Sequence, residues 1–330
     1  MSKIVVLGAG AWGTALAVIA ARGGNAVTLC ARRQPHLEAM RKHRENATYL
    51  PGIEFPKALA LSGNWLEAVS AAEVAVMAIP SKFAHAAIAL VVSAIPPHAT
   101  LVSVTKGIEQ DTLRRMSEML AEVAPPANRL AVLSGPGFAA ELARGKPAAL
   151  VAASNNLEIA QQVQKLFSAR PLRIYTSTDV VGVELGGTVK NVIAVAAGVS
   201  DGLGLGSSAR AALITRGIAE MMRLAEAAGA RRETIAGLAG LGDLVLTCTG
   251  ELSRNRTLGL RIARGDKILP DAGGAPVAEG APNARAVRML AERIGVEMPI
   301  VSAVYRLLYE GAPANAMVEE LLSRELKAEF

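Results

Sequence analysis

A lysine in apolar surroundings is the first feature of this sequence that suggests chemistry. Lys190 and Asn191 interrupt the segment 189–197, which is otherwise apolar on nearly every side and lies among glycines that permit close helix packing. Such a lysine either extends its ammonium group to solvent or is held in place for a reaction. Because burial disfavours the charged form, the pKa of a held lysine falls toward the range in which an amine exchanges protons with a carbonyl or hydroxyl oxygen.

Three further features offer partners for that lysine and a place for a ligand. Lys106 ends an expected strand, at the carboxyl edge where doubly wound sheets bind ligands. Asp243 is a candidate to orient Lys190. The segment 134–141, SGPGFAAE, predicts a glycine-rich turn after the next strand, with backbone N–H groups for a cofactor or a phosphate. An ordinary loop is the alternative for each of the two segments that follow strands.

A basic cluster at 253–256 suggests phosphate binding. The sequence Ser253-Arg254-Asn255-Arg256 opens an expected helix, with Ser253 as a possible N-cap. Arg254 and Asn255 then lie beside a helix N-terminus, whose unpaired N–H groups and dipole favour an anion. The sequence predicts a phosphate clamp here, with a capped surface helix as the alternative.

The glycine turn near the N-terminus predicts a dinucleotide site. Gly8, Gly10 and Gly13 form a GxGxxG between an expected strand at 4–7 and an Ala-rich helix at 14–21. In that context Gly8 permits a tight turn, Gly10 lets the backbone approach a pyrophosphate, and Gly13 allows close helix–strand packing. The phosphates are expected on the helix N-terminus.

The residues after the second strand bear on which nicotinamide cofactor binds. An NAD-selective site usually carries Asp or Glu about 20 residues after the glycine turn, where it accepts from the ribose 2′-hydroxyl. Here the strand at 26–30 is followed by Ala31, Arg32 and Arg33. Two guanidinium groups favour NADP over NAD, because they pair with a 2′-phosphate.

The elements that must position these residues fall into two groups. Residues 1 to about 175 alternate short β-branched runs with helical segments, as in βαβ units with a buried parallel sheet. The expected strands are apolar on both faces and lie at 4–7, 26–30, 74–79, 101–104, 130–133 and 149–152. The expected helices of the remaining chain lie at 181–199, 208–228, 234–239, 256–264, 284–293 and 302–310. We predict an α/β fold, with an N-terminal Rossmann-type doubly wound sheet domain at 1–180 and an all-α C-terminal substrate-binding and catalytic domain at 181–330.

Composition argues against several classes of protein. The net charge of +6 is spread along 330 residues of which only 3% are aromatic, which argues against nucleic-acid binding and suits a pocket for small anions. Cys30 and Cys248 lack metal-ligand spacing, so we expect no metal site and a reducing, cytoplasmic location. The uncharged stretch 83–105 contains Pro96 and Pro97 and divides into a helix and a strand, so we expect no membrane insertion.

Taken together, these segments resemble the bacterial NAD(P)-dependent glycerol-3-phosphate dehydrogenases, essentially from end to end. The matching segments are GAGAWGTALA at 8–17, NATYLP at 46–51, SVTKG at 103–107, SGPGFAAE at 134–141, GVELGGTVKN at 182–191, GLGDLVLTC at 240–248 and SRNR at 253–256. So many separated matches in one order make the resemblance specific.

The resemblance implies hydride transfer from NAD(P)H to dihydroxyacetone phosphate, the reverse oxidation of sn-glycerol 3-phosphate, a supply of that product to glycerophospholipid biosynthesis, and a homodimer. It implies Lys190 as general acid and base, with Lys106 and Asp243 completing the catalytic pocket. The implied substrate contacts are Lys106, Gly135, Gly137, Lys190, Asp243, Ser253, Arg254 and Asn255. The implied cofactor contacts are Gly8, Gly10, Trp12, Gly13, Thr14, Arg32, Arg33, Tyr49, Lys106, Ala139, Arg254, Val277 and Glu279.

Three departures from the family pattern limit these implications. Gly137 stands where a hydroxyl residue is usual, Ser208 replaces an asparagine, and Pro282-Asn283 interrupts the run after Glu279. None of them touches the expected proton donor, so they bear on affinity and not on the type of reaction.

Two alternative functions share the predicted architecture. One is a dehydrogenase of the 3-hydroxyacid or 6-phosphogluconate type, against which the segments 134–141 and 253–256 argue. The other is a redox-sensing protein that binds the dinucleotide without turnover. The presence of Lys190 and Asp243 argues against that second alternative.

Overall fold

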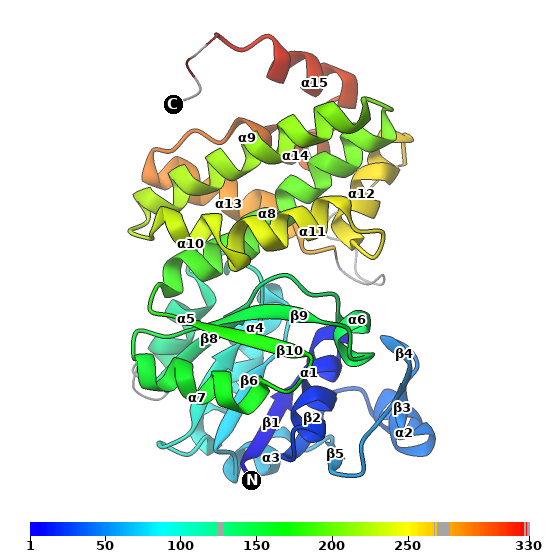
Figure 1. Ribbon diagram of the computed structural model, residues 1–330, viewed down its shortest axis with the longest axis vertical. Helices are drawn as coiled ribbons and strands as arrows, with labels where there is room; N and C mark the ends of the chain where they lie inside the picture. Colours follow the sequence, from blue (N-terminus) through cyan, green and yellow to red (C-terminus); the bar gives the residue numbers. More distant parts are fainter. Residues whose placement is uncertain (125–128, 267, 269–277, 327, 329–330) are drawn as a thin grey trace.

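The chain folds into a sheet flanked by helices and, above it in Figure 1, a stack of helices. The computed structural model describes residues 1–124, 129–266, 268, 278–326 and 328. The α/β class, with a Rossmann-type sheet followed by a helical domain, is confirmed, since every element described after residue 177 is helical.

Eight strands form the sheet, in the order β10-β9-β8-β7-β6-β1-β2-β5. The strands are β1 (Lys3–Leu7), β2 (Ala26–Cys30), β5 (Leu59–Ser62), β6 (Val74–Met77), β7 (Thr100–Ser103), β8 (Leu130–Ser134), β9 (Ala148–Ala153) and β10 (Leu172–Ser177). From β5 to β8 all neighbours are parallel, in the doubly wound order. The strand order reverses between β1 and β6, which is where such sheets bind ligands.

The strand at 148–153 corrects one expectation. We predicted it as part of an all-parallel sheet, but β9 pairs antiparallel with β8. The connection between these strands holds only the five-residue helix α6 (Ala139–Ala143), which packs against the first helix of the chain and is too short to cross the sheet. The chain therefore returns from the edge at which β8 ended, and the segment 135–147 stays at that edge.

Helices cover both faces of the sheet. Along β1, Ile4 and Val6 join the core on the side of α1 and α7, whereas Val5 and Leu7 join the core on the side of α4 and α5. The helices of this half are α1 (Ala11–Arg22), α2 (Gln34–His43), α3 (Trp65–Ser70), α4 (Ser81–Ala89), α5 (Met116–Val123), α6 and α7 (Leu157–Phe167). A hairpin of β3 (Glu45–Asn46) and β4 (Leu50–Glu54) lies beside α2.

One long helix organises the second half. Nearly all of α8 (Val180–Gly202) is buried, and Asp179 caps it by accepting from the Gly182 N–H at 2.9 Å. By length and composition alone α8 is apolar enough to cross a membrane, but 89% of its most apolar window is buried inside the structure. The other helices are α9 (Gly206–Ala227), α10 (Arg232–Ala236), α11 (Asp243–Thr249), α12 (Arg254–Ala263), α13 (Gly280–Ile294), α14 (Pro299–Tyr309) and α15 (Ala314–Leu322), with a π-helical turn at Leu238–Gly242.

Helices α8 and α12 touch through their backbones. A Cβ atom on Gly198 would lie 2.0 Å from the Arg256 carbonyl oxygen, and one on Gly259 would lie 2.0 Å from that of Val195. Real atoms do not approach so closely, so this crossing requires glycine on both helices. The contact fixes the start of α12 relative to the middle of α8.

Candidate active site

Three charged side chains from distant parts of the chain meet where the sheet edge faces the helical half. Lys190 lies in the middle of α8, Asp243 begins α11, and Lys106 lies three residues after β7. The Lys190 Nζ atom is 3.0 Å from Asp243 Oδ1, and the Lys106 Nζ atom is 2.6 Å from Asp243 Oδ2. Asp243 thus binds one ammonium group with each oxygen.

Two of these side chains are buried, and that of Lys106 is nearly so. The exposed fraction is 7% for the Lys190 side chain, 14% for Lys106 and 1% for Asp243. Lys190 therefore does not extend to solvent, and of the two alternatives that the sequence left open the structure shows a lysine held in the interior.

Two oxygen atoms complete the cluster. Thr247, one turn after Asp243 on α11, accepts from Lys190 Nζ at 2.7 Å and donates to the Asp243 backbone carbonyl at 2.6 Å. The Gly135 carbonyl accepts from Lys106 Nζ at 3.0 Å. An ammonium group carries three hydrogens, so the described contacts use two on each lysine and leave one for a ligand.

The surroundings give the lysine and the carboxylate different proton affinities. Burial lowers the pKa of Lys190 to about 8, with Asp243 opposing that change and Lys106 adding to it. Burial acts to raise the pKa of Asp243, but the two ammonium groups outweigh it and the pKa lies below its ordinary value. Asp243 thus stays charged at neutral pH, whereas Lys190 gains or loses a proton near pH 8.

The glycine turn has the geometry that a dinucleotide phosphate needs. Gly8 has φ +112°, and a Cβ atom on Gly13 would lie 2.1 Å from the Gly8 carbonyl oxygen. A Cβ on Gly10 would meet nothing within 4 Å, and Gly10 caps α1 without a side-chain hydrogen bond. Gly8 and Gly13 therefore have the tight turn and the close packing that were predicted, and the open space at Gly10 beside the N-terminus of α1 fits a phosphate group.

A buried asparagine holds the next loop against this turn. Asn46 Nδ2 donates to the Ala9 carbonyl at 3.0 Å and to Thr14 Oγ1 at 2.8 Å. Asn46 Oδ1 accepts from the Tyr49 N–H at 3.3 Å, and the Tyr49 hydroxyl accepts a hydrogen bond from Arg33. Arg32 and Arg33 are both exposed at the end of β2.

Trp12 connects the glycine turn to the charged cluster. The Lys106 Nζ atom lies 5.6 Å from the Trp12 ring centroid. Trp12 Nε1 is buried without a hydrogen-bond partner among the described residues. The turn and the lysines therefore belong to one site.

Some polar groups of the predicted phosphate clamp are hydrogen-bonded within the protein. Ser253 caps α12 as predicted, accepting from the N–H three residues on at 3.2 Å. Asn255 Nδ2 donates to Asn191 Oδ1 at 2.8 Å, and Asn255 Oδ1 accepts from the Gly280 N–H at 2.8 Å. Among the described residues, one N–H of Asn255 has no partner, whereas Arg254 is exposed at the start of α12.

The glycine-rich turn after β8 contains one of the departures from the family pattern. Gly135 has φ +129°, which favours glycine. A Cβ atom on Gly137 would lie 2.8 Å from a Leu142 methyl carbon and 3.3 Å from the Trp12 ring. A side chain at 137 would therefore require these two side chains to shift, and glycine offers only its backbone here. Ala139 follows as the first residue of α6.

The remaining predicted cofactor residues lie before α13. Glu279 directly precedes this helix and is half-buried; burial raises its pKa, with Arg254 and Lys190 opposing. Val277 lies outside the described residues.

Sequence reasoning missed two polar side chains of this site. Thr247 lies four residues after Asp243, a spacing that places both on one face of a helix and offered a signal. Asn283 donates to the Lys106 carbonyl at 2.9 Å, and only its place in an atypical segment set it apart in the sequence.

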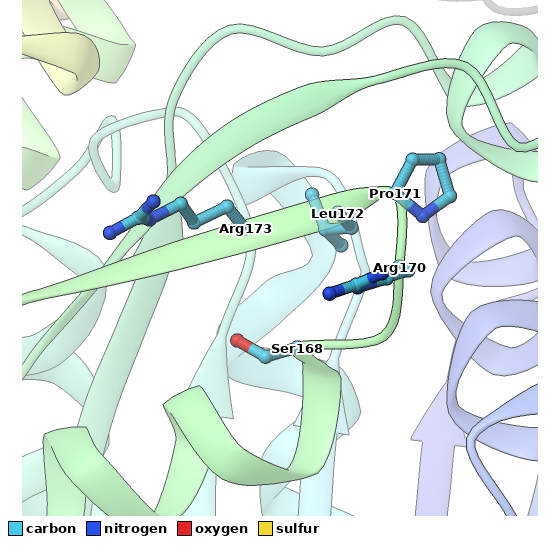
Figure 2. A pocket seen from close by; sticks show the side chains of 5 residues that line it. All are labelled: Ser168, Arg170, Pro171, Leu172 and Arg173. Atoms are coloured by element: carbon cyan, nitrogen blue, oxygen red, sulfur yellow. The ribbon is translucent and has the colours of Figure 1, made fainter.

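A separate cavity lies far from this cluster. Figure 2 shows its lining side chains at the turn between α7 and β10. Its volume is about 270 Å³. Its lining residues are Ser168, Arg170, Pro171, Leu172 and Arg173, none of which belongs to the candidate site.

A glycine turn at the switch point of a doubly wound sheet, joined to a buried lysine on the first long helix of a second domain, defines a two-domain Rossmann-type dehydrogenase. Comparison with known proteins narrows this class. The family model described as the NAD-dependent glycerol-3-phosphate dehydrogenase N-terminus matches residues 3–160, and the C-terminus model of that family matches residues 179–319. The chain belongs to the NAD-dependent glycerol-3-phosphate dehydrogenase family.

Relatives of similar length support this assignment. The glycerol-3-phosphate dehydrogenase (NAD(P)+) of Geobacter sulfurreducens is 51% identical, over 99% of this chain and 98% of the relative. That of Thiobacillus denitrificans is 50% identical, over 99% and 100%. The crystal structure of the Coxiella burnetii glycerol-3-phosphate dehydrogenase is 38% identical and superposes with a TM-score of 0.92, covering 98% of this chain and 99% of that one.

Proposed function

We propose that this chain reduces dihydroxyacetone phosphate to sn-glycerol 3-phosphate with NAD(P)H and catalyses the reverse oxidation. The observation that carries the proposal is the buried Lys190 ammonium group. It binds Asp243 in the same site as the glycine turn, whose Trp12 ring lies beside Lys106. The names of the relatives support the substrate, since the chain covers both bacterial proteins almost completely.

Lys190 is the proposed general acid and base. In the reduction its ammonium group gives a proton to the ketone oxygen while the carbon receives a hydride, and the neutral amine regains a proton from solvent. In the oxidation the neutral amine takes the hydroxyl proton. Asp243 orients Lys190, and Lys106 stabilises negative charge on the reacting oxygen. General acid–base catalysis of this kind contributes about 10²–10⁴-fold.

The other assigned residues bind the two ligands. When bound, the nicotinamide cofactor supplies a hydride to the ketone or accepts one from the alcohol. The proposed substrate contacts beyond the charged cluster are Gly135, Gly137, Ser253, Arg254 and Asn255. The proposed cofactor contacts are Gly8, Gly10, Trp12, Gly13, Thr14, Arg32, Arg33, Tyr49, Lys106, Ala139, Arg254, Val277 and Glu279. Arg254 has a charge that matches the substrate phosphate and an exposed position from which to reach it.

Further parts of the proposal concern the cofactor, the domains and the cellular setting. The exposed Arg32 and Arg33 support a preference for NADP over NAD, because no carboxylate follows β2 directly. We divide the chain into domains at 1–180 and 181–330; the gap between the two family matches and the separate cores of the two halves support that division. A cytoplasmic homodimer without membrane insertion that supplies glycerol 3-phosphate to glycerophospholipid biosynthesis completes the proposal.

Steady-state kinetics test the proposed reaction. The purified protein, assayed with dihydroxyacetone phosphate and either NADPH or NADH, is expected to show turnover whose rate falls as pH rises through about 8, because the proton donor is lost. Oxidation of sn-glycerol 3-phosphate is expected to speed up over the same range. A preference for a 3-hydroxyacid, or equally slow NADPH oxidation by the wild type and Lys190→Ala, would overturn the proposal.

A further inference from the structure

Asn283 joins three parts of the structure that meet beside the charged cluster. It lies in the first turn of α13, which packs along α8, and its side chain is fully buried. Its Nδ2 atom donates to the Lys106 carbonyl at 2.9 Å and to the Thr188 carbonyl on α8 at 3.3 Å. One amide group therefore links α13 and α8 to the loop that carries Lys106.

Other contacts hold this loop on either side of the Lys106 carbonyl: Thr105 Oγ1 donates to the Ile79 carbonyl at 2.6 Å, and the Lys106 ammonium group binds Asp243. Lys106 lies beyond the last paired residue of β7, so the sheet ladder does not hold it. Its carbonyl also accepts from Asn191 Nδ2, but at the longer distance of 3.4 Å. Because the position of a side chain follows that of its backbone, the contact with Asn283 restricts where the Lys106 ammonium group lies.

The next residue is packed closely between α4 and α13. A Cβ atom on Gly107 would lie 2.6 Å from Ser81 Oγ and 3.1 Å from Asn283 Oδ1. A side chain at 107 would therefore collide with Ser81 on α4 and crowd Asn283 more mildly.

We propose that Asn283 is a positioning residue for the reaction: it ties the Lys106 loop to α8 and thereby sets the separation of the Lys106 and Lys190 ammonium groups around Asp243. The inference rests on the proposed function and extends it to a residue in the segment that departs from the family pattern. It also explains why an amide suits position 283, since its two N–H groups face two carbonyl oxygens and a carboxylate would repel both.

Two substitutions test this role. Asn283→Ala removes the donor, and Asn283→Asp keeps the shape but replaces the NH₂ group with an acceptor. Both are expected to lower kcat for dihydroxyacetone phosphate at least tenfold. The KM for the nicotinamide cofactor is expected to change less, because Lys106 is only one of its proposed contacts and the glycine turn stays in place. Asn156→Ala is the matched control, because Asn156 caps α7 and lies outside the site.

The pH profile separates positioning from a loss of stability. The charged groups that face Lys190 are Asp243 on α11, Lys106 after β7 and Glu279 before α13, and Lys106 is the one that lowers its proton affinity. Release of Lys106 in Asn283→Ala is therefore expected to move the alkaline limb of kcat to higher pH, while Asn156→Ala keeps the wild-type profile.

The outcomes are distinguishable within one experiment. A wild type without turnover on dihydroxyacetone phosphate overturns the proposed function and this inference with it. An active wild type, with Asn283→Ala matching it in kcat and in pH profile, overturns this inference alone, whatever the melting temperature. A lower kcat with a shifted limb in Asn283→Ala and unchanged kinetics in Asn156→Ala support it.

Discussion

Two buried carboxylates of the helical half, Asp243 and Glu220, differ in what surrounds them. Asp243 is 1% exposed and meets two ammonium groups, and its pKa is lowered. Glu220, on α9, is 3% exposed and accepts from the backbone N–H groups of Ile300 at 2.7 Å and Val301 at 3.4 Å, at the start of α14. Burial raises the pKa of Glu220 to about 7, although these N–H groups and two arginines oppose it.

The difference shows that burial alone does not decide the charge of a carboxylate. Full positive charges at hydrogen-bonding distance keep Asp243 ionised, whereas backbone dipoles only partly offset the desolvation of Glu220. Asp243 is thus an anion at neutral pH that binds two lysine side chains. Glu220 is a structural acceptor that binds a helix terminus in either protonation state.

Asp243→Asn is expected to have the largest effect, because it leaves two buried ammonium groups without a carboxylate. Loss of one partner from a buried ion pair costs about 3–5 kcal/mol, which should appear in the free energy of unfolding by urea titration. The pKa of Lys190 should also fall below its wild-type value of about 8, since Asp243 raises it. A variant with wild-type stability would mean that the two ammonium groups stabilise the Asp243 carboxylate no more than backbone N–H groups stabilise that of Glu220.

Lys190→Met is expected to lower kcat by about 10²–10⁴-fold while leaving the protein folded. The apolar side chain fills the space of the lysine stem, and Asp243 keeps Lys106 as its partner. Stopped-flow measurement of NADPH oxidation should show that the alkaline limb near pH 8 has disappeared along with the rate. A retained limb would assign that titration to another group.

Glu220→Gln tests the other side of the comparison. In the folded wild type the Glu220 carboxyl group has a pKa of about 7, above its ordinary value of 4.5. Between these pH values the folded state binds the proton more tightly than the unfolded state, so the wild-type protein loses stability as pH rises. At about 1.4 kcal/mol per pKa unit, the free energy of unfolding of Glu220→Gln should gain about 3 kcal/mol on the wild type between pH 4 and pH 8. Urea titrations at both pH values measure this difference, and parallel curves would refute it. Activity at pH 7 serves as the control, since Glu220 lies outside the site.

Thr247→Val is expected to have the smallest effect. It removes the hydroxyl that accepts from Lys190 at 2.7 Å but leaves the ion pair with Asp243. A hydrogen bond to a charged group contributes about 1.5–3 kcal/mol, so kcat should fall by about 10- to 150-fold at most. Steady-state assays with Thr249→Val as a matched control decide the point, because Thr249 is exposed on the same helix. A loss as large as that of Lys190→Met would show that the hydroxyl has a role beyond orientation.

The sequence predicted the central strands well and the sheet margins poorly. The expected strands were apolar on both faces, a pattern that describes β1, β6 and β7. In β10 buried Leu172 and Ile174 alternate with exposed Arg173 and Tyr175, because this edge strand has one face in solvent. A search for two-sided apolar runs therefore missed it.

The direction of a strand also could not be predicted from its residue types. The segment 148–153 is as apolar as its parallel neighbours, and only the length of the helix before it determines its direction. Direction follows from the connection and not from the strand itself.

The parts of the candidate site that could be predicted are those where a residue type is unusual in its local sequence. A lysine among aliphatic residues and a GxGxxG after a strand are each unusual enough to suggest a function. The structure shows Lys190 held in the interior, and it shows the tight turn at Gly8 with close packing at Gly13. Asn283 and Thr247 act through contacts with residues far away or one turn away, and their types are common in any helix. Asn255 shows the converse, since the sequence marked it for a ligand while most of its amide group binds within the protein.

The glycine crossing of α8 and α12 has a consequence for substrate size. Lys190 lies two turns before Gly198 on one helix, and Arg254 opens the other five residues before Gly259. In the proposed reaction these side chains hold opposite ends of one molecule, so the crossing acts as a gauge of its length. A methyl group at either glycine would spread the helices and lengthen the distance between Lys190 and Arg254. The fit of a three-carbon phosphate therefore depends on the absence of a Cβ atom at both positions.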